Sequence, residues 1–81
     1  MSAEERLRHV FIRSLELPET LDVSDLEYRR HEGWDSVGHM RLVAAIEQEF
    51  GIFLETAQIL DFDSFKRGLE ILKIHGIVDK S

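Results

Sequence analysis

The chain has 81 residues and a formal net charge of −6, and this length suits a single domain, residues 1–81, with one hydrophobic core. It contains no cysteine, so disulfides and thiolate zinc sites are excluded, and its four histidines lack the spacing of metal ligands. The excess of acid argues against nucleic acid as a partner, because binding to a phosphate backbone needs clustered Lys and Arg. We expect basic protein surfaces to be the partners.

The first predicted helix covers about residues 3–15. Ser2 is its expected N-cap, with Glu5 three residues later as in a capping box, and apolar residues follow at helical spacing. Pro18 is expected to close the helix, because proline supplies no amide N–H and pushes the preceding residue out of the helical region.

Residues 16–35 show neither a helical nor a strand period. Apolar residues still recur there, so we expect a long structured loop that covers the core, with room for one helical turn near Ser24–Tyr28. The loop holds seven Asp and Glu against two Arg, which places −5 of the chain's −6 charge just before Ser36. Both a solvated surface and a docking patch for a basic partner explain this charge.

The second predicted helix covers about residues 36–50 and stops at Gly51. Steps of about 100° per residue place four apolar side chains on its core face, with His39 close by. These four are Leu42, Val43, Ile46 and Phe50. The opposite side carries a second strip, formed by Val37, Met40, Ala44 and Glu47. This strip either meets a partner protein or lies beneath the loop at 16–35.

Two more helices are predicted towards the end of the chain. A short helix at about 56–60 has Thr56 as its expected N-cap, and a last helix at about 65–75 is capped by the turn at 61–64. No segment alternates for long enough to form a strand. The fold class is therefore all-α, a small four-helix bundle of three longer helices and one short one, with a long first loop.

The N-terminal residues are charged from the start, and no apolar run approaches the length of a bilayer span or the core of a signal peptide. We therefore expect a cytoplasmic protein without a membrane partner. The net charge favours a soluble monomer.

Ser36 stands at the start of the second predicted helix, where backbone N–H groups and the helix dipole favour an anion. The spacing of Gly33, Ser36 and Gly38 does not match the G-x-S-x-G turn of hydrolases, and no strand precedes it. Asp35, Ser36 and His39 do not form a catalytic triad either, because Asp35 is not positioned to orient the imidazole. We expect His39 to be a packed, hydrogen-bonded residue. On spacing alone, Ser36 reads as a simple helix cap.

A longer pattern extends from this serine. The run Asp35-Ser36-Val37, followed by Met40-x-Leu42-Val43-x-x-Ile46-Glu47-x-Glu49-Phe50-Gly51-Ile52, resembles the signature of the acyl carrier protein family. In that family an Asp-Ser-Leu motif opens the second helix of a four-helix bundle. The likeness extends to the first helix, the long acidic loop, the short third helix and the closing helix.

The resemblance implies that Ser36 carries 4′-phosphopantetheine, transferred from coenzyme A by a phosphopantetheinyl transferase with Mg²⁺. Asp35 would then assist metal and transferase binding, and the thiol of the arm would hold acyl groups as thioesters for acyl-loading and acyl-processing enzymes. The protein would be a carrier and not an enzyme. Partner enzymes would contact Val37, Met40 and Ala44 together with the carboxylate of Glu47.

The chain departs from the family pattern at several positions. Val37 replaces the usual leucine, Gly38 costs about 1 kcal/mol relative to alanine in a helix, and Arg41 and Gln48 replace residues that tend to be acidic in carriers of bacterial fatty acid synthesis. Trp34 and the run Val37-Gly38-His39-Met40 are more similar to stand-alone carriers of specialised pathways, for cargo such as polyketide, aminoacyl or other acyl units.

The main alternative is an unmodified helical protein–protein interaction module in which Ser36 is only a cap. A DNA-binding helix-turn-helix is disfavoured, since Arg41 is the one Lys or Arg in the best candidate for a recognition helix.

Overall fold

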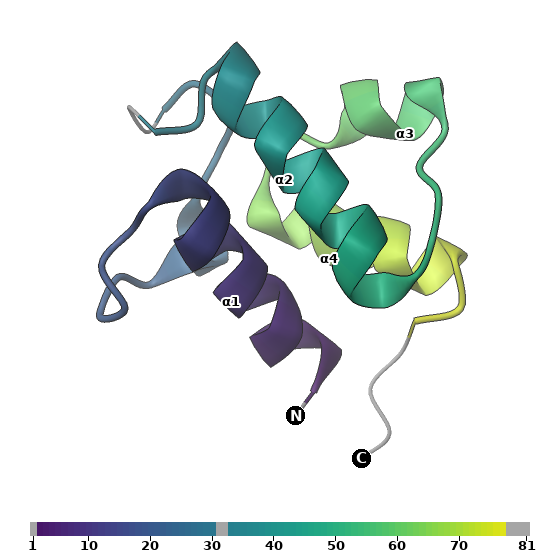
Figure 1. Cartoon of the computed structure of the whole chain (residues 1–81), viewed down its shortest axis with the longest axis horizontal. Helices are drawn as coiled ribbons and strands as arrows, with labels where there is room; N and C mark the ends of the chain where they lie inside the picture. Colours follow the sequence, from purple (N-terminus) through teal and green to yellow (C-terminus); the bar gives the residue numbers. More distant parts are fainter. Residues whose placement is uncertain (1, 31–32, 78–81) are drawn as a thin grey trace.

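The computed structural model describes residues 2–30 and 33–77 (Figure 1). Within these ranges the elements are α1 (Ala3–Leu15), the short 3-10 helix η1 (Val23–Asp25), α2 (Ser36–Phe50), α3 (Thr56–Asp61) and α4 (Phe65–Ile74). In Figure 1, α1 and α2 run in opposite directions and α4 passes behind them. The predicted all-helical bundle is confirmed. In the described part of the chain, none of the helices combines the length and apolar character needed to cross a membrane.

The first helix has the predicted bounds but ends for a different reason. Ser2 is the N-cap, and its Oγ accepts a hydrogen bond from the amide of Glu5 at 3.1 Å. The helix ends at Leu15 because Glu16 adopts a left-handed conformation with φ of 54°. The chain therefore leaves the helix before it reaches Pro18, and the expectation that proline closes α1 was wrong.

The last two helices each differ from prediction by one residue. α3 extends to Asp61, and its N-cap is Glu55 instead of the expected Thr56. Glu55 and Gln58 form a capping box, in which the Glu55 amide donates to Oε1 of Gln58 at 3.1 Å. α4 is capped by Ser64 as the preceding turn predicted, but it ends at Ile74.

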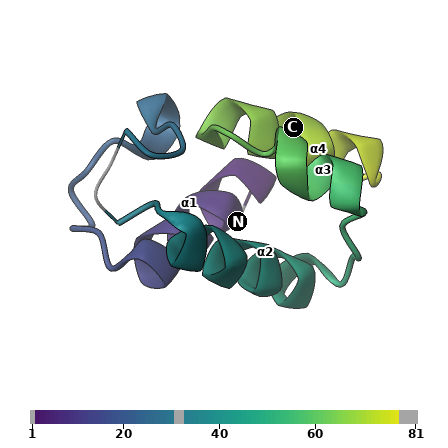
Figure 2. The same cartoon turned by 90° about the horizontal axis from the view of Figure 1, so that it is seen from above.

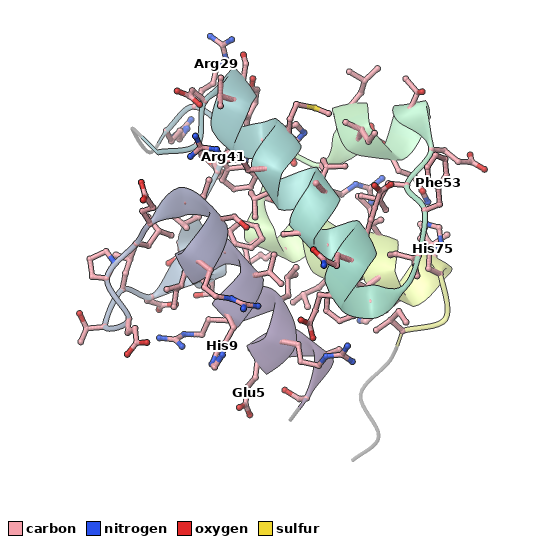
Figure 3. The ribbon with its side chains drawn as sticks, viewed as in Figure 1. Glu5, His9, Arg29, Arg41, Phe53 and His75 are labelled. Carbon is pink, nitrogen blue, oxygen red and sulfur yellow. The ribbon has the colours of Figure 1, made fainter. Side chains whose placement is uncertain are left out.

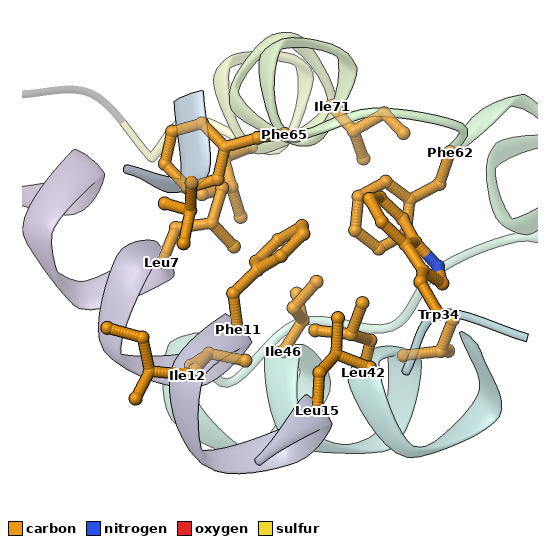
Figure 4. Close-up of a cluster of buried hydrophobic side chains, with 14 of the residues drawn as sticks. Leu7, Phe11, Ile12, Leu15, Trp34, Leu42, Ile46, Phe62, Phe65 and Ile71 are labelled. Atoms are coloured by element: carbon orange, nitrogen blue, oxygen red, sulfur yellow. The ribbon is translucent and has the colours of Figure 1, made fainter. Parts of the chain in front are cut away.

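The core lies between α1, α2 and α4, with an indole at one end (Figure 4). All four predicted core residues of α2 are buried, as expected from the helical period. Trp34, which the sequence did not assign to the core, is 0% exposed. Its ring lies 5.1 Å from the ring of Phe11 and 5.5 Å from that of Phe62, centroid to centroid. The residue just before the α2 N-cap is thus part of the core.

The loop between α1 and α2 covers the core as predicted. Leu17 and Val23 are buried, while Leu21, Leu26 and Tyr28 are partly buried against the core cluster. The helical turn expected near 24–28 is present as η1, slightly earlier in the chain. Figure 2 shows this loop and η1 at the end of the molecule where α2 begins.

Trp34→Ala should lower the free energy of unfolding by about 3–5 kcal/mol, as expected when a buried aromatic side chain is removed. A domain of this size has about 4–12 kcal/mol in total, so the variant should be close to unfolding. Urea titration followed by circular dichroism measures the change. Phe53→Ala is the control, since its side chain is 77% exposed and the expected change is within about 0.5 kcal/mol. A similar loss of unfolding free energy in both variants would contradict the burial of Trp34 in the core.

Candidate functional site

The N-cap of α2 is Asp35 and not Ser36. Oδ1 of Asp35 accepts a hydrogen bond from the amide of Gly38 at 2.8 Å. Ser36 is therefore the first residue within the helix, and its side chain is exposed. This corrects the view of Ser36 as a helix cap, because the neighbouring carboxylate performs that role. The serine hydroxyl remains available at the surface.

The same dipeptide precedes α4, where the two side chains have the opposite arrangement. In the pair Asp63-Ser64, the serine is the N-cap, and its Oγ accepts from the amide of Arg67 at 3.0 Å. α2 begins at the serine of its Asp-Ser pair, whereas α4 begins one residue after the serine. The Ser64 hydroxyl is therefore used in capping, and the Ser36 hydroxyl is not. Ser36 and Ser64 are a natural pair for comparison.

Two side chains from the first loop lie against the Ser36 hydroxyl. Nη2 of Arg29 donates to Ser36 Oγ at 3.3 Å, and the hydroxyl of Tyr28 lies 3.4 Å from the same atom. Figure 3 shows Arg29 beside the first turn of α2. The hydrogen bond with Ser36, followed by the neighbouring Arg29 guanidinium, lowers the pKa of Tyr28 below its ordinary value. These groups give the serine a cationic, hydrogen-bonding environment.

Backbone hydrogen bonds hold this pair of loop residues in place. The amide of Tyr28 donates to the carbonyl of Asp63 at 2.8 Å, and the amide of Arg29 donates to the carbonyl of Trp34 at 3.0 Å. Arg29 has φ of 67°, a left-handed conformation that costs a residue other than glycine about 1–2 kcal/mol. Sequence reasoning did not assign Tyr28 or Arg29 to the site. The signal that could have found Arg29 is a pair of arginines in an otherwise acidic loop.

His39 is occupied by structural contacts. Its Nδ1 accepts from the indole Nε1 of Trp34 at 3.0 Å, so the ring proton is on Nε2, which donates to the carbonyl of Ile59 at 2.9 Å. The imidazole is half-buried and joins the loop before α2 to α3. This is the packed, hydrogen-bonded histidine expected from the sequence, and both ring nitrogens are engaged away from Ser36.

Gly38 allows the loop to approach the first turn of α2. A Cβ atom at this position would lie 2.3 Å from the carbonyl oxygen of Gly33 and 3.0 Å from Cδ2 of Leu15. The sequence suggested that glycine here only weakens the helix. The structure gives it a steric role, since any side chain would push away the backbone that leads into Trp34 and Asp35.

The apolar strip predicted on the outer side of α2 is exposed. Val37 is 60% exposed, Met40 is 55% exposed, and Ala44 also faces solvent. The alternative in which the first loop covers these residues is therefore wrong. An apolar surface next to Ser36 remains open to another molecule.

Glu47, the fourth residue of this strip, has a contact of its own. Its carboxylate Oε2 accepts a hydrogen bond from the amide of Leu54 at 2.9 Å, and the residue is half-buried. The bond ties the end of α2 to the segment before α3. The carboxylate thus has a structural partner within the chain, whereas Asp35 is exposed at the start of the helix.

Comparisons with protein-family models, with curated proteins and with solved structures find no match to this chain.

Gly38→Ala should lower the free energy of unfolding by about 1–3 kcal/mol, as in other overpacked sites, although alanine favours a helix by about 1 kcal/mol over glycine. The reason is the contact of the new Cβ with Gly33 at 2.3 Å. Chemical unfolding measures the effect. Ala44→Gly, at an exposed position of α2, reports helix propensity alone and should cost about 1 kcal/mol. A more stable Gly38→Ala would contradict the close approach.

Proposed function

We propose that this chain is an acyl carrier protein, modified on Ser36 with 4′-phosphopantetheine. The observation that carries the proposal is the state of the Ser36 hydroxyl. It is exposed at the start of α2, it is released from capping by Asp35, and the guanidinium of Arg29 donates to it at 3.3 Å. These features supplement the resemblance of the Asp35-Ser36-Val37 segment to the carrier signature.

The residues around Ser36 fit a phosphodiester. Such a group carries one negative charge, which is favoured by the first-turn amides and dipole of a long helix such as α2. Arg29 adds a cation, and Tyr28 adds a hydroxyl that can donate a hydrogen bond. The contact of Ser36 with a cation distinguishes it from Ser64, whose hydroxyl accepts from a backbone amide.

The attachment reaction uses coenzyme A as the second substrate. Oγ of Ser36 forms a bond to the phosphorus that carries the pantetheine, and the bond from that phosphorus to the bridging oxygen of the pyrophosphate breaks. Adenosine 3′,5′-bisphosphate leaves, and the hydroxyl proton passes to a base of the transferase. Asp35, which uses Oδ1 to cap α2, would assist the binding of Mg²⁺ and of the transferase through its exposed carboxylate.

The arm supplies a terminal thiol that holds acyl groups as thioesters, a group that this cysteine-free chain lacks. The protein would act as a cytoplasmic, monomeric carrier in fatty acid, polyketide or related biosynthesis, and the enzymes would provide the catalysis. Val37, Met40 and Ala44 offer apolar contacts beside Ser36, and the acidic first loop attracts basic docking surfaces.

Incubation with coenzyme A, Mg²⁺ and a broad-specificity phosphopantetheinyl transferase should add one phosphopantetheine group to the wild-type chain, as read by intact mass. Ser36→Ala should abolish the gain, because it removes the nucleophile. Ser64→Ala is the matched control, since it removes the hydroxyl of the other Asp-Ser pair and should leave the gain unchanged.

A wild-type protein that gains no mass, or a Ser36→Ala variant that gains as much as wild type, would end the carrier proposal. The unmodified helical interaction module would then be the better account of the exposed strip on α2.

Met40→Glu should lower kcat/KM for modification by the transferase about 5- to 30-fold, the effect of losing an interface contact of about 1–2 kcal/mol. The fold should persist, because Met40 is 55% exposed and contributes little to the core. Phe53→Glu is the control: it places the same charge on a 77% exposed side chain in the segment between α2 and α3 (Figure 3), and it should leave kcat/KM near the wild-type value. Equal losses in both variants would show that charge alone, and not the strip, is responsible.

A further inference from the structure

The two adjacent arginines of the first loop have different partners. Nε of Arg30 pairs with the carboxylate of Glu27 at 2.9 Å, a common contact on an exposed acidic surface. Arg29 instead directs Nη2 to the hydroxyl of Ser36, and its guanidinium carbon lies 5.4 Å from the centre of the Tyr28 ring. Arg29 thus places its charge at the one serine proposed for modification.

The backbone of Arg29 is held in an unfavourable conformation to reach this position. Its φ of 67° is left-handed, which is uncommon for a residue with a Cβ atom. The hydrogen bond from the Arg29 amide to the carbonyl of Trp34, at 3.0 Å, maintains this conformation. Residues held in sparsely populated backbone conformations cluster at active sites and ligand-binding sites.

We propose that Arg29, assisted by Tyr28, binds the phosphodiester at Ser36 and so holds the first loop more firmly against the modified end of α2. This inference rests on the proposed function and adds to it a named residue that binds the attached group. Attachment of the phosphodiester to Oγ places two non-bridging oxygens, which share one negative charge, two bonds beyond the atom that Arg29 now contacts. The planar fork of a guanidinium suits such a pair of oxygens, so the contact becomes charge-assisted with small side-chain rotations.

Two backbone amides report how often this part of the loop opens. The amide of Arg29 is bonded to Trp34 and the amide of Tyr28 to Asp63, so each exchanges with solvent when this part of the loop opens. An added side-chain contact at Ser36 disfavours opening. For a solvent-exposed charge pair, the expected slowing of exchange is about two- to fivefold.

The experiment measures hydrogen exchange of these two amides by NMR in the unmodified and the modified protein, after intact mass has established modification. For each amide, the exchange rate in the unmodified protein divided by the rate in the modified protein should be about two to five in the wild type and in Arg30→Ala. In Arg29→Ala this ratio should be close to one. Both variants remove one positive charge from the same loop, and alanine keeps the Cβ atom and hence the left-handed strain at position 29. Arg29→Lys, which keeps the charge without the fork, should fall between them.

The wild type supplies a second measurement that needs no variant. Because the contact is electrostatic and exposed, the ratio should fall towards one in about 1 M salt, where the Debye length is about 3 Å. A ratio of one at low salt, a ratio that salt does not change, or equal ratios in Arg29→Ala and wild type would each overturn the inference while the mass gain keeps the carrier function intact. Failure of the wild type to gain mass would overturn both.

Discussion

The hydrogen bond between the indole of Trp34 and the imidazole of His39 organises the end of the molecule that carries Ser36. A fully buried indole must place its N–H against an acceptor, because an unpaired buried donor costs about 1–3 kcal/mol. His39 supplies that acceptor and uses its other nitrogen to bind Ile59 of α3. The carbonyl of Trp34 also accepts the amide of Arg29. One residue therefore fixes the first loop, α2 and α3 relative to Ser36.

The helices were predictable because the forces that form them are local. The apolar period of α1 and α2 and the caps at Ser2, Gly51 and Ser64 lie within a few residues of the elements that they define. Errors occurred where two neighbouring groups compete for the same role. Glu55 caps α3 in place of Thr56, and Asp35 caps α2 in place of Ser36. Pattern alone does not decide between Asp35 and Ser36, since both are favoured cap residues. At α3, Thr56 is the favoured type, but Glu55 forms a capping box with Gln58.

The candidate site was predictable only in part, because half of it comes from long-range contacts. Ser36 and Asp35 were found from a local motif, and the exposure of Met40 followed from helical geometry. Tyr28 and Arg29 reach the site through backbone bonds to Asp63 and Trp34, and no sequence period marks such bonds. The steric role of Gly38 likewise depends on a loop carbonyl that approaches from outside the helix.

The charge distribution sets two conflicting requirements on this end of the bundle. In the proposed carrier, the acidic first loop would steer basic enzymes to the site, but the same loop, with its net charge of −5, would repel an anion on Ser36. Each carboxylate at about 10 Å contributes only about 0.4 kcal/mol of repulsion in water before salt screens it further. A guanidinium already in contact with Ser36 Oγ acts at a third of that distance, where attraction is strongest. In the proposed carrier, one cation held in contact would thus stabilise the anion, while the surrounding carboxylates would still attract basic partners at long range.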